Sequence, residues 1–258
     1  MSDSQTITAD TVIIGGGVAA LWTANVLKNS GHSIAVLTNS PLGSDQTLAA
    51  QGVIHGGLKY AVAGKLTDSS EALADMPSRW LSAMRGEGPV DLTGASLLSD
   101  HQVMWSLPGL LSKTVSFFGS KALRGRSAAL PRGEYPEVFR TEKYRGTLFR
   151  IEEPVIDPVS IMEALALGVE EYTWLVDWDQ NAELISEGKE ISGIALRSLN
   201  GEETFLKATQ FILAAGAGNG DFLKKLEIES PQMQRRPLHQ LIIRKDDLPD
   251  FYSVCVGS

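Results

Sequence analysis

The feature that most constrains the fold is a run of three glycines at residues 15–17, set between two apolar segments. Residues 11–14 are short, largely β-branched and free of charge, which is typical of a strand buried on both faces of a parallel sheet. Residues 18–28 predict a helix, and Gly31 is placed to end it. Residues 33–38 predict a second buried strand. Strand, turn, helix and strand within about 30 residues form a βαβ unit.

The glycines follow the pattern G-x-G-x-x-A, written here as GGGVAA. The first glycine permits a tight turn, the second lets a pyrophosphate approach the backbone, and the final alanine allows the helix to pack closely on the strand. The helix N-terminus adds free N–H groups and the positive end of its dipole. The pattern therefore predicts a dinucleotide site at Gly15, Gly16, Gly17, Val18, Ala19 and Ala20. A tight βα turn that binds nothing is the alternative.

One usual feature of such sites is missing. The second strand of a dinucleotide-binding unit commonly ends in an acidic residue that binds the ribose hydroxyls. Thr38 holds that place here, with Asn39 beside it. Either side chain could hydrogen-bond a ribose, but without the strength of a charged acceptor.

The rest of the chain predicts further helices and a β-rich segment. A helical pattern over 69–85 contains Pro77, which should break it, and Asp157-Pro158 begins a helix that runs to about residue 168. Residues 174–208 look entirely β, with turns that separate strands at 182–186, 191–196 and 203–208, and a further buried strand follows at 211–215. The prediction is an α/β protein with a Rossmann-type domain, a β-meander and a discontinuous second α+β domain.

Composition excludes several classes of function. Acidic residues outnumber basic ones 31 to 23, so the chain as a whole does not suggest nucleic-acid binding, and Cys255 is the single cysteine. The four histidines are scattered without metal-ligand spacing, so we expect no metal site. The uncharged segment between Asp10 and Lys28 is short for a membrane span and contains the three glycines. We expect a soluble, cytoplasmic protein.

Four segments carry a family resemblance. VIIGGGVAALWTANVL, QTLAAQGVIHGGLKY, EPVIDPVS and FILAAGAGN occur in the order seen in the D-amino-acid oxidase superfamily of FAD-dependent oxidoreductases, and together they span nearly the whole chain. VIHGGLKY resembles a segment of flavin-linked glycerol-3-phosphate dehydrogenases and L-2-hydroxyglutarate oxidases. The resemblance implies FAD rather than NAD. It also implies an FAD-binding domain at residues 8–74 and 176–236, and a substrate domain at 75–175 and 237–258.

The resemblance further implies which residues lie along the cofactor. The segment after the second strand would run beside the pyrophosphate and the flavin, and the later buried strand would return to close the site. Gly52 fits such a place, because a flat isoalloxazine ring needs backbone without side chains against it. The residues implied are Ser44, Gln46, Thr47, Gln51, Gly52, Ala215 and Gly216.

His55 is the sharpest catalytic candidate. His55 and Lys59 share a face whether VIHGGLKY is extended or helical. Near a flavin, His55 could take a substrate proton while a hydride leaves to N5. Lys59, with Tyr60, could hold a carboxylate or phosphate. The alternative is a structural histidine beside a solvated lysine.

Charge is unevenly distributed. Residues 113–150 hold nine basic and three acidic side chains, so this segment carries +6 and the remainder −14. Such a segment could steer an anionic substrate or contact an acidic membrane surface, although a solvated face is the commoner explanation.

These observations predict hydride transfer from a small anionic hydroxy acid, amino acid or polyol phosphate to FAD, with oxygen or a quinone as the final acceptor. The alternatives are an NAD-binding dehydrogenase and an inactive fragment that is at most a dinucleotide-binding module. The family usually continues past the point that matches Ser258, so we expect a chain truncated at its C-terminus.

Overall fold

The computed structural model describes residues 5–57, 68–106, 127–198, 200–235, 237 and 239–256. The chain divides into two compact units, each assembled from three segments. The first unit comprises Met1–Ala50, Ala83–Gly94 and Pro158–His239, and the second comprises Gln51–Ser82, Ala95–Asp157 and Gln240–Ser258. The limits of the FAD-binding domain and the substrate domain given above remain predictions.

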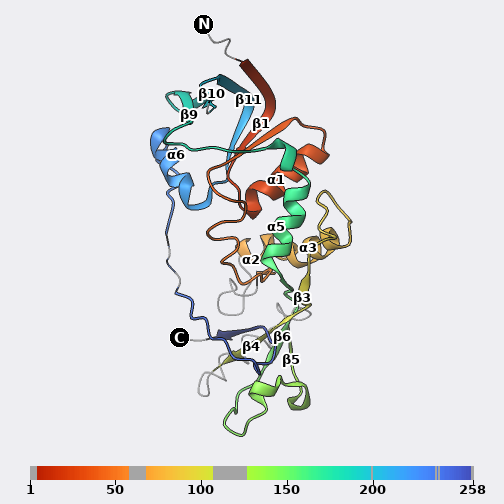
Figure 1. Cartoon of the computed structure of the whole chain (residues 1–258). Helices are drawn as coiled ribbons and strands as arrows, with labels where there is room; N and C mark the ends of the chain where they lie inside the picture. Colours follow the sequence, from red (N-terminus) through yellow and green to blue (C-terminus); the bar gives the residue numbers. More distant parts are fainter. Residues whose placement is uncertain are drawn as a thin grey trace. The chain divides into compact units, whose positions relative to one another are not determined.

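The first unit is built on a six-stranded sheet in the order β8-β2-β1-β11-β10-β9. The first four of these strands are parallel, and β10 and β9 continue the sheet as an antiparallel meander. Figure 1 shows β1 in red beside the blue strand β11. The strands are β1 (Gln5–Ile14), β2 (Ile34–Thr38), β8 (Thr173–Leu175), β9 (Ala182–Glu187), β10 (Glu190–Arg197) and β11 (Glu203–Leu213).

The predicted strands are confirmed with one correction. Two separate strands were expected at 203–208 and 211–215, but β11 is continuous from Glu203 to Leu213. It pairs with β1 from Thr204 to Leu213 and with β10 from Glu203 to Leu206. Thr209 and Gln210, which lie between the two expected strands, are polar but exposed, so the strand carries them at no cost in burial. The fold class, a Rossmann-type α/β domain with a meander and a second α+β domain, is confirmed.

Helix α1 (Val18–Asn29) follows the glycines as predicted and packs against β2 and α5 (Pro158–Leu167). The buried side chain of Asn25 joins the two helices, since its Nδ2 donates to the carbonyl oxygens of Leu21 and Leu165, each at 2.9 Å. Gly31 adopts φ +88° just after the helix, the left-handed conformation expected of a residue that ends one.

The core of the first unit lies within the sheet and meander. Its fully buried members include Leu37, Ile194 and Leu206, each with 0% of its surface exposed. Trp174 and Trp178 are partly buried and pack against this cluster. A single apolar cluster spanning β1, β2, β9, β10 and β11 therefore supports the edge of the sheet from which the glycine turn emerges.

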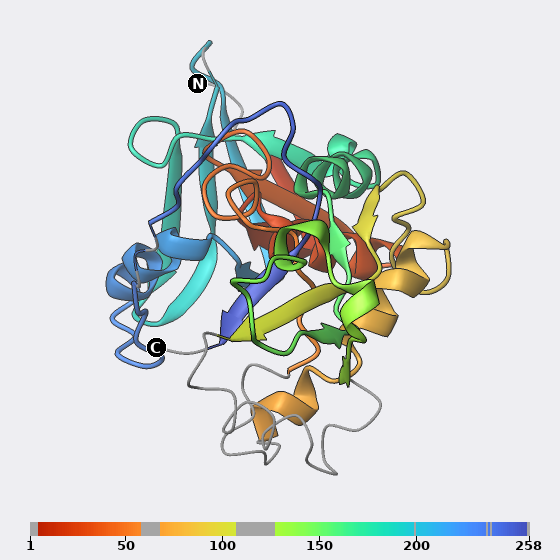
Figure 2. The same ribbon diagram turned by 90° about the horizontal axis from the view of Figure 1, so that it is seen from below.

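The second unit contains two smaller sheets, ordered β12-β4-β6-β5 and β3-β7. Figure 2 shows the yellow strand β4 lying alongside the blue strand β12, its parallel partner. Val103, Tyr135, Phe139 and Leu148 form a buried cluster in this unit. The strands are β3 (Leu97–Ser99), β4 (Gln102–Ser106), β5 (Ser127–Ala129), β6 (Phe149–Ile151), β7 (Val155–Ile156) and β12 (Ser253–Val256).

The remaining helices are short. The pattern over 69–85 is broken as predicted, into α2 (Asp68–Ala72) and α3 (Met76–Met84), and Pro77 lies in the first turn of α3, where a missing N–H costs nothing. Helix α6 (Asn219–Lys225) follows β11. The 3₁₀ turns are η3 (Arg132–Glu134), η4 (Glu137–Phe139), η5 (Glu170–Tyr172) and η6 (Gly216–Gly218).

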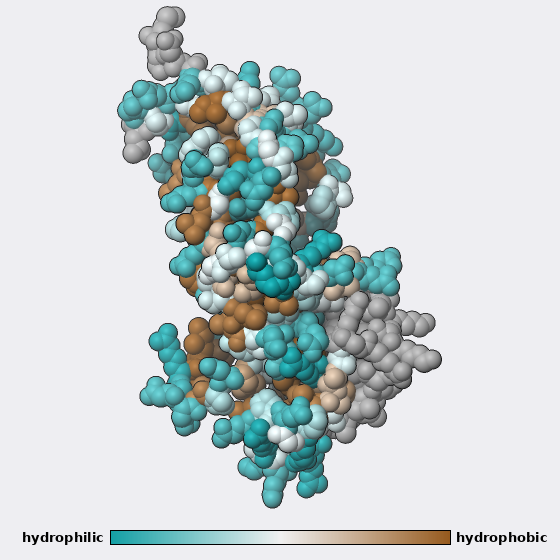
Figure 3. Space-filling view, turned by 90° about the vertical axis from the view of Figure 1, so that its right-hand side faces the viewer, coloured by the Kyte–Doolittle hydropathy of each residue, from teal (hydrophilic) through white to brown (hydrophobic). Residues whose placement is uncertain are grey.

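Hydrophobic and hydrophilic side chains are interspersed on the face of the molecule seen in Figure 3. The exposed apolar residues include three neighbours in the second unit, Leu241, Ile242 and Ile243. Among the described residues, no helix is both long enough and apolar enough to cross a membrane.

Candidate functional site

The glycine turn, residues 15–17, leaves the end of β1 between the ends of two neighbouring strands. The Gly15 amide donates to the Leu37 carbonyl oxygen of β2 at 2.8 Å. A Cβ on Gly15 would lie 2.3 Å from the carbonyl oxygen of Ala214, and Gly15 has φ +139°. Both the space and the backbone conformation therefore require glycine, because an L side chain would collide with the chain that leaves β11.

The next two glycines bring the backbone close to side chains of the same unit. A Cβ on Gly16 would lie 2.4 Å from the Thr38 hydroxyl oxygen, and one on Gly17 would lie 3.0 Å from the Thr47 hydroxyl oxygen. Gly17 is the N-cap of α1, where it offers no capping side chain, and the first turn of the helix has no acidic residue. The turn therefore presents a helix N-terminus with no carboxylate in its first turn, which suits a pyrophosphate.

The residues after the turn fit the predicted packing. Ala20 is fully buried and Ala19 is exposed. The Val18 amide donates to the Thr47 hydroxyl at 3.3 Å, so one first-turn amide is already held by the loop of residues 39–50. A small side chain at position 20 lets α1 lie close to the sheet.

The loop of residues 39–50 is tied to the glycine turn, since the Gly43 amide donates to the Gly16 carbonyl oxygen at 2.8 Å. Gln46 lies near the other strand end, where its Oε1 is 3.7 Å from the position of a Cβ on Gly216. Ser44 bonds within the loop by donating to the Pro41 carbonyl oxygen. The structure thus brings Gln46, Thr47 and Gly216 together around the predicted cofactor turn.

The end of β11 completes this group. The Ala214 amide donates to the Ile14 carbonyl oxygen at 2.8 Å, and the Ala215 amide donates to Asn219 Oδ1, also at 2.8 Å. Gly216 follows with φ +56°. The predicted residues Ala215 and Gly216 therefore lie directly beside the glycine turn.

Thr38 and Asn39 differ in their access to a ligand. Thr38 is 5% exposed, points towards Gly16, and donates its hydroxyl proton to the Ser40 carbonyl oxygen at 2.8 Å. Asn39 is exposed. Of the two residues proposed for the ribose, Asn39 is thus the one with an open side chain.

In the second unit, residues 52–54 run antiparallel to residues 154–156. Val53 and Val155 form a β-bridge, and the Ile54 amide donates to the Pro154 carbonyl oxygen at 2.9 Å. Gly52 has φ +72°, and a Cβ there would lie 1.9 Å from the Ile156 carbonyl oxygen. Gln51 is exposed at the start of this segment. Gly52 is therefore required by a close backbone approach within its own unit.

This pairing places His55 against a buried carboxylate. His55 Nδ1 lies 2.9 Å from Glu153 Oε2, the Gly56 amide donates to Glu153 Oε1 at 2.7 Å, and Gln102 Nε2 donates to Glu153 Oε2 at 2.6 Å. Glu153 and Gln102 are each 3% exposed, whereas 32% of the His55 side chain is exposed. We call His55, Gly56, Gln102 and Glu153 the His55 cluster.

The sequence prediction missed Glu153 and Gln102. Phe149, Ile151 and Glu153 are buried, while Arg150 and Glu152 between them are less so. This is the period of two expected of an extended chain, so the alternation places the second of two adjacent glutamates on the inner face. That signal was available before the structure, although nothing in it identified His55 as the partner.

The outer face of the same strands carries a separate charge network. Arg150 pairs with Asp100 at 3.1 Å and with Glu152 at 2.8 Å. The pKa of Asp100 is lowered, chiefly by the hydrogen bond from the His101 ring and then by Arg150. The pKa of Arg150 is raised, chiefly by its hydrogen bond to Glu152. Arg150, the last basic residue of the segment 113–150, is thus engaged in surface ion pairs.

Lys59 and Tyr60 lie outside the described residues, as does the part of the basic segment before residue 127. Among the residues that are described, no group of three or more His, Cys, Asp or Glu side chains is arranged to hold a metal ion.

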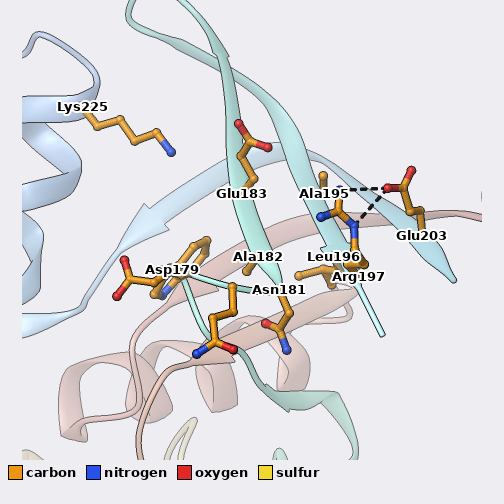
Figure 4. Close-up of a pocket in the computed structure, with 11 residues that line it drawn as sticks. Asp179, Asn181, Ala182, Glu183, Ala195, Leu196, Arg197, Glu203 and Lys225 are labelled. Carbon is orange, nitrogen blue, oxygen red and sulfur yellow. Dashed lines mark hydrogen bonds and ion pairs between the residues drawn. The ribbon is translucent and has the colours of Figure 1, made fainter. Parts of the chain in front are cut away.

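A cavity of about 330 Å³ lies on the meander of the first unit. Figure 4 shows Arg197 bonded to Glu203 at its rim, with Lys225 extending from α6. Glu183 and Asp179 also line it, so charges of both signs surround it. It contains none of the residues predicted for the cofactor or for catalysis.

Comparison with known proteins gives a consistent result. The model of the family described as FAD dependent oxidoreductase matches residues 10–253. The chain is 36% identical over 254 residues to the probable FAD-dependent oxidoreductase PA4991 of Pseudomonas aeruginosa, and this match covers 98% of the chain and 63% of that protein. The chain therefore spans less than two thirds of the length of this relative.

Solved structures are similar as well. The crystal structure of PA4991 matches with a TM-score of 0.74 at 30% identity, over 98% of this chain and 60% of that one. Glycine oxidase from Geobacillus kaustophilus matches with a TM-score of 0.62 at 17% identity, over 85% and 58%. L-alpha-glycerophosphate oxidase from Mycoplasma pneumoniae, solved with FAD bound, matches with a TM-score of 0.60 at 18% identity, over 84% and 56%. The last two similarities establish the fold alone.

Proposed function

Because this chain belongs to the family of FAD-dependent oxidoreductases, we propose that the protein oxidises a small anionic substrate by transferring a hydride from it to the N5 atom of FAD. Membership of the family confirms the predicted resemblance and the prediction of FAD rather than NAD as cofactor. The substrate and the activity of this chain are our proposals.

The observation that carries the proposal is the glycine turn at the N-terminus of α1. Because Gly16 and Gly17 have no Cβ, the backbone there lies close to the hydroxyl groups of Thr38 and Thr47. No acidic side chain lies in the first turn of α1. These residues would hold the pyrophosphate of FAD, with Thr47, Gln46 and Gly216 around it. FAD, when bound, supplies the hydride acceptor.

For catalysis, we propose that His55 is the base that accepts the proton of the substrate hydroxyl or amine. Its ring is partly exposed, and its Nδ1 is held by a buried carboxylate, which is suitable for a base that must keep its orientation. Lys59 and Tyr60 would hold the anionic group, a role that rests on the family resemblance.

The class of substrate remains a choice between an amine and an alcohol. The solved structures named glycine oxidase and L-alpha-glycerophosphate oxidase have the same fold as this chain, so the fold supports both. We propose a small hydroxy acid, amino acid or polyol phosphate, with oxygen or a quinone as the final electron acceptor.

The test begins with the absorption spectrum of the purified protein before and after denaturation. We expect a flavin spectrum, with the flavin released into solution unless it is covalently attached. Anaerobic reduction by a panel of amino acids, hydroxy acids and polyol phosphates then identifies the substrate class. Protein that takes up no FAD, even when it is added in excess, would refute the proposal for this chain.

The proposed roles of His55 and Lys59 separate in kinetics. His55→Gln should slow flavin reduction in a single turnover by about 10²–10⁴-fold, the usual contribution of a general base. Lys59→Met should mainly raise KM, because a lost anchor weakens ground state and transition state together. FAD should stay bound in both variants. Reduction of His55→Gln at the wild-type rate would assign His55 a structural role only.

A further inference from the structure

Glu153 is a buried carboxylate whose hydrogen-bond partners are unusually informative. A backbone amide can only donate, and so can the Nε2 group of a glutamine. The Gly56 amide donates to Oε1 of Glu153, and Gln102 Nε2 donates to Oε2. Both oxygens therefore act as acceptors, and His55 Nδ1 lies 2.9 Å from Oε2, a distance that suits a ring nitrogen donating to the same carboxylate.

We propose that Glu153 is a positioning residue that holds His55 as its Nδ1–H tautomer, so that Nε2 is the ring nitrogen that accepts a proton. The role of the accepted proton rests on the function proposed above. When Nε2 takes the proton from the substrate, the ring keeps Nδ1–H and becomes an imidazolium paired with the Glu153 carboxylate. No further proton has to leave the cluster for the step to balance.

Backbone pairing explains why the carboxylate can hold the ring in one place. Residues on either side of the contact belong to two antiparallel segments, joined by the Val53–Val155 bridge and by the hydrogen bond from the Ile54 amide. Glu153 is also nearly inaccessible to water, so its bonds to protein donors are not exchanged for bonds to solvent. The position of the carboxylate relative to His55 is therefore set by the fold of the second unit.

The proposal predicts that the substitution Glu153→Gln changes the tautomer of His55. An amide has one acceptor and one donor end, and the Gly56 amide requires the acceptor at the Oε1 position. The donor end then faces His55 Nδ1 and favours the opposite tautomer, with the proton on Nε2. Gln102 can adapt by rotating its own side-chain amide by about 180°, so that its oxygen accepts from the new amide. The variant therefore keeps these buried hydrogen bonds while the tautomer of the His55 ring is reversed.

Nitrogen NMR of the intact protein labelled with ¹⁵N-histidine measures the tautomer directly, at a pH about two units above the ordinary histidine pKa of ~6.5. The spectrum of His55→Gln assigns the His55 signals. We expect wild-type His55 to carry its proton on Nδ1, and Glu153→Gln to move it to Nε2. The matched control Glu152→Gln, at an exposed neighbour that pairs with Arg150, should leave the proton on Nδ1.

The wild-type spectrum alone can overturn the proposal, whether or not a variant folds. A proton on Nε2 would contradict it, and so would a ring protonated on both nitrogens under these conditions. An unchanged tautomer in a folded Glu153→Gln protein would show that Glu153 does not determine it.

Kinetics separates this inference from the proposed function. If Glu153 acts through His55, Glu153→Gln should slow flavin reduction by at least about tenfold alone, but by less than about twofold in a His55→Gln background. A full additional loss in that background would refute positioning through His55. If His55→Gln itself has no effect, the proposed function of His55 fails, while the tautomer measurement still decides the role of Glu153.

Discussion

The glycine turn and the His55 cluster are two candidate sites built in different ways. The turn is made of backbone, and its conformation is fixed by close contacts with the ends of neighbouring strands and with side chains at the same edge of the sheet. The His55 cluster uses side chains that are distant in sequence, since His55 and Glu153 are 98 residues apart and Gln102 and Glu153 are 51 apart. The comparison teaches that spacing reveals a site made of backbone, whereas a site made of distant side chains requires knowledge of strand pairing.

Glycine substitutions should have the largest effect and should act on one unit each. Gly15→Ala would place a Cβ 2.3 Å from the Ala214 carbonyl oxygen, and Gly52→Ala would place one 1.9 Å from the Ile156 carbonyl oxygen, each at positive φ. We expect each to lower the free energy of unfolding of its unit by about 2–5 kcal/mol. Hydrogen exchange should accelerate in β1 and β11 for Gly15→Ala, and in β7 for Gly52→Ala.

The matched control is Gly133→Ala, because a Cβ on Gly133 meets no atom within 4 Å and its φ is not positive. It should change unfolding by less than about 0.5 kcal/mol. Equal acceleration of exchange in both units by Gly15→Ala would show that the two units are not independently stabilised.

Gly17→Val tests the turn as a binding site rather than as a structural element. Gly17 has φ −88°, which a valine can adopt, and a Cβ there meets only the Thr47 hydroxyl at 3.0 Å. The fold should survive, while a branched side chain would stand where the pyrophosphate approaches. We expect FAD affinity to fall at least about a hundredfold, or about 2.7 kcal/mol, measured by flavin fluorescence titration with Gly133→Val as control.

Unchanged flavin occupancy in Gly17→Val, with a native circular-dichroism spectrum, would remove the turn from the cofactor site. It would also remove the contrast between the two regions, since the turn would then serve the fold alone.

The smallest expected effect concerns the residue after β2. Asn39 is exposed, so Asn39→Asp should supply the charged ribose acceptor that the sequence lacks and tighten FAD binding about tenfold. Thr38→Glu should weaken binding instead, because it buries a carboxylate against Gly16. Titration of both variants checks the order, and tighter binding by Thr38→Glu would place the ribose at Thr38.

Much of the first unit follows from local patterns. The βαβ unit, the helix that begins at Asp157-Pro158 and the strands of the meander all appear in the structure. Each depends on periodicity, on a cap or on a turn residue, which are properties of neighbouring residues. The single strand β11 was divided in error, because two adjacent polar residues such as Thr209 and Gln210 can stay within a strand where both of its faces reach solvent.

The second unit was predicted less fully. Its sheets combine segments from residues 97 to 256, so pairing partners are far apart and local patterns cannot choose between them. His55 was singled out by its place in VIHGGLKY, but its partner was not, because burial of Glu153 rather than Glu152 matters only once both segments are paired.

The pairing of β1 with β11 has a consequence for synthesis of the chain. Gln5 lies opposite Thr204 in this pair, so one edge of β1 stays unpaired until about 200 further residues have been synthesised. At about 5–20 residues per second, translation takes about 10–40 s to reach that point. During this interval β1 and β2 can form, but the other edge of β1 stays unpaired and open to foreign strands. The nascent chain should therefore depend most on chaperones before residue 213 has emerged from the ribosome.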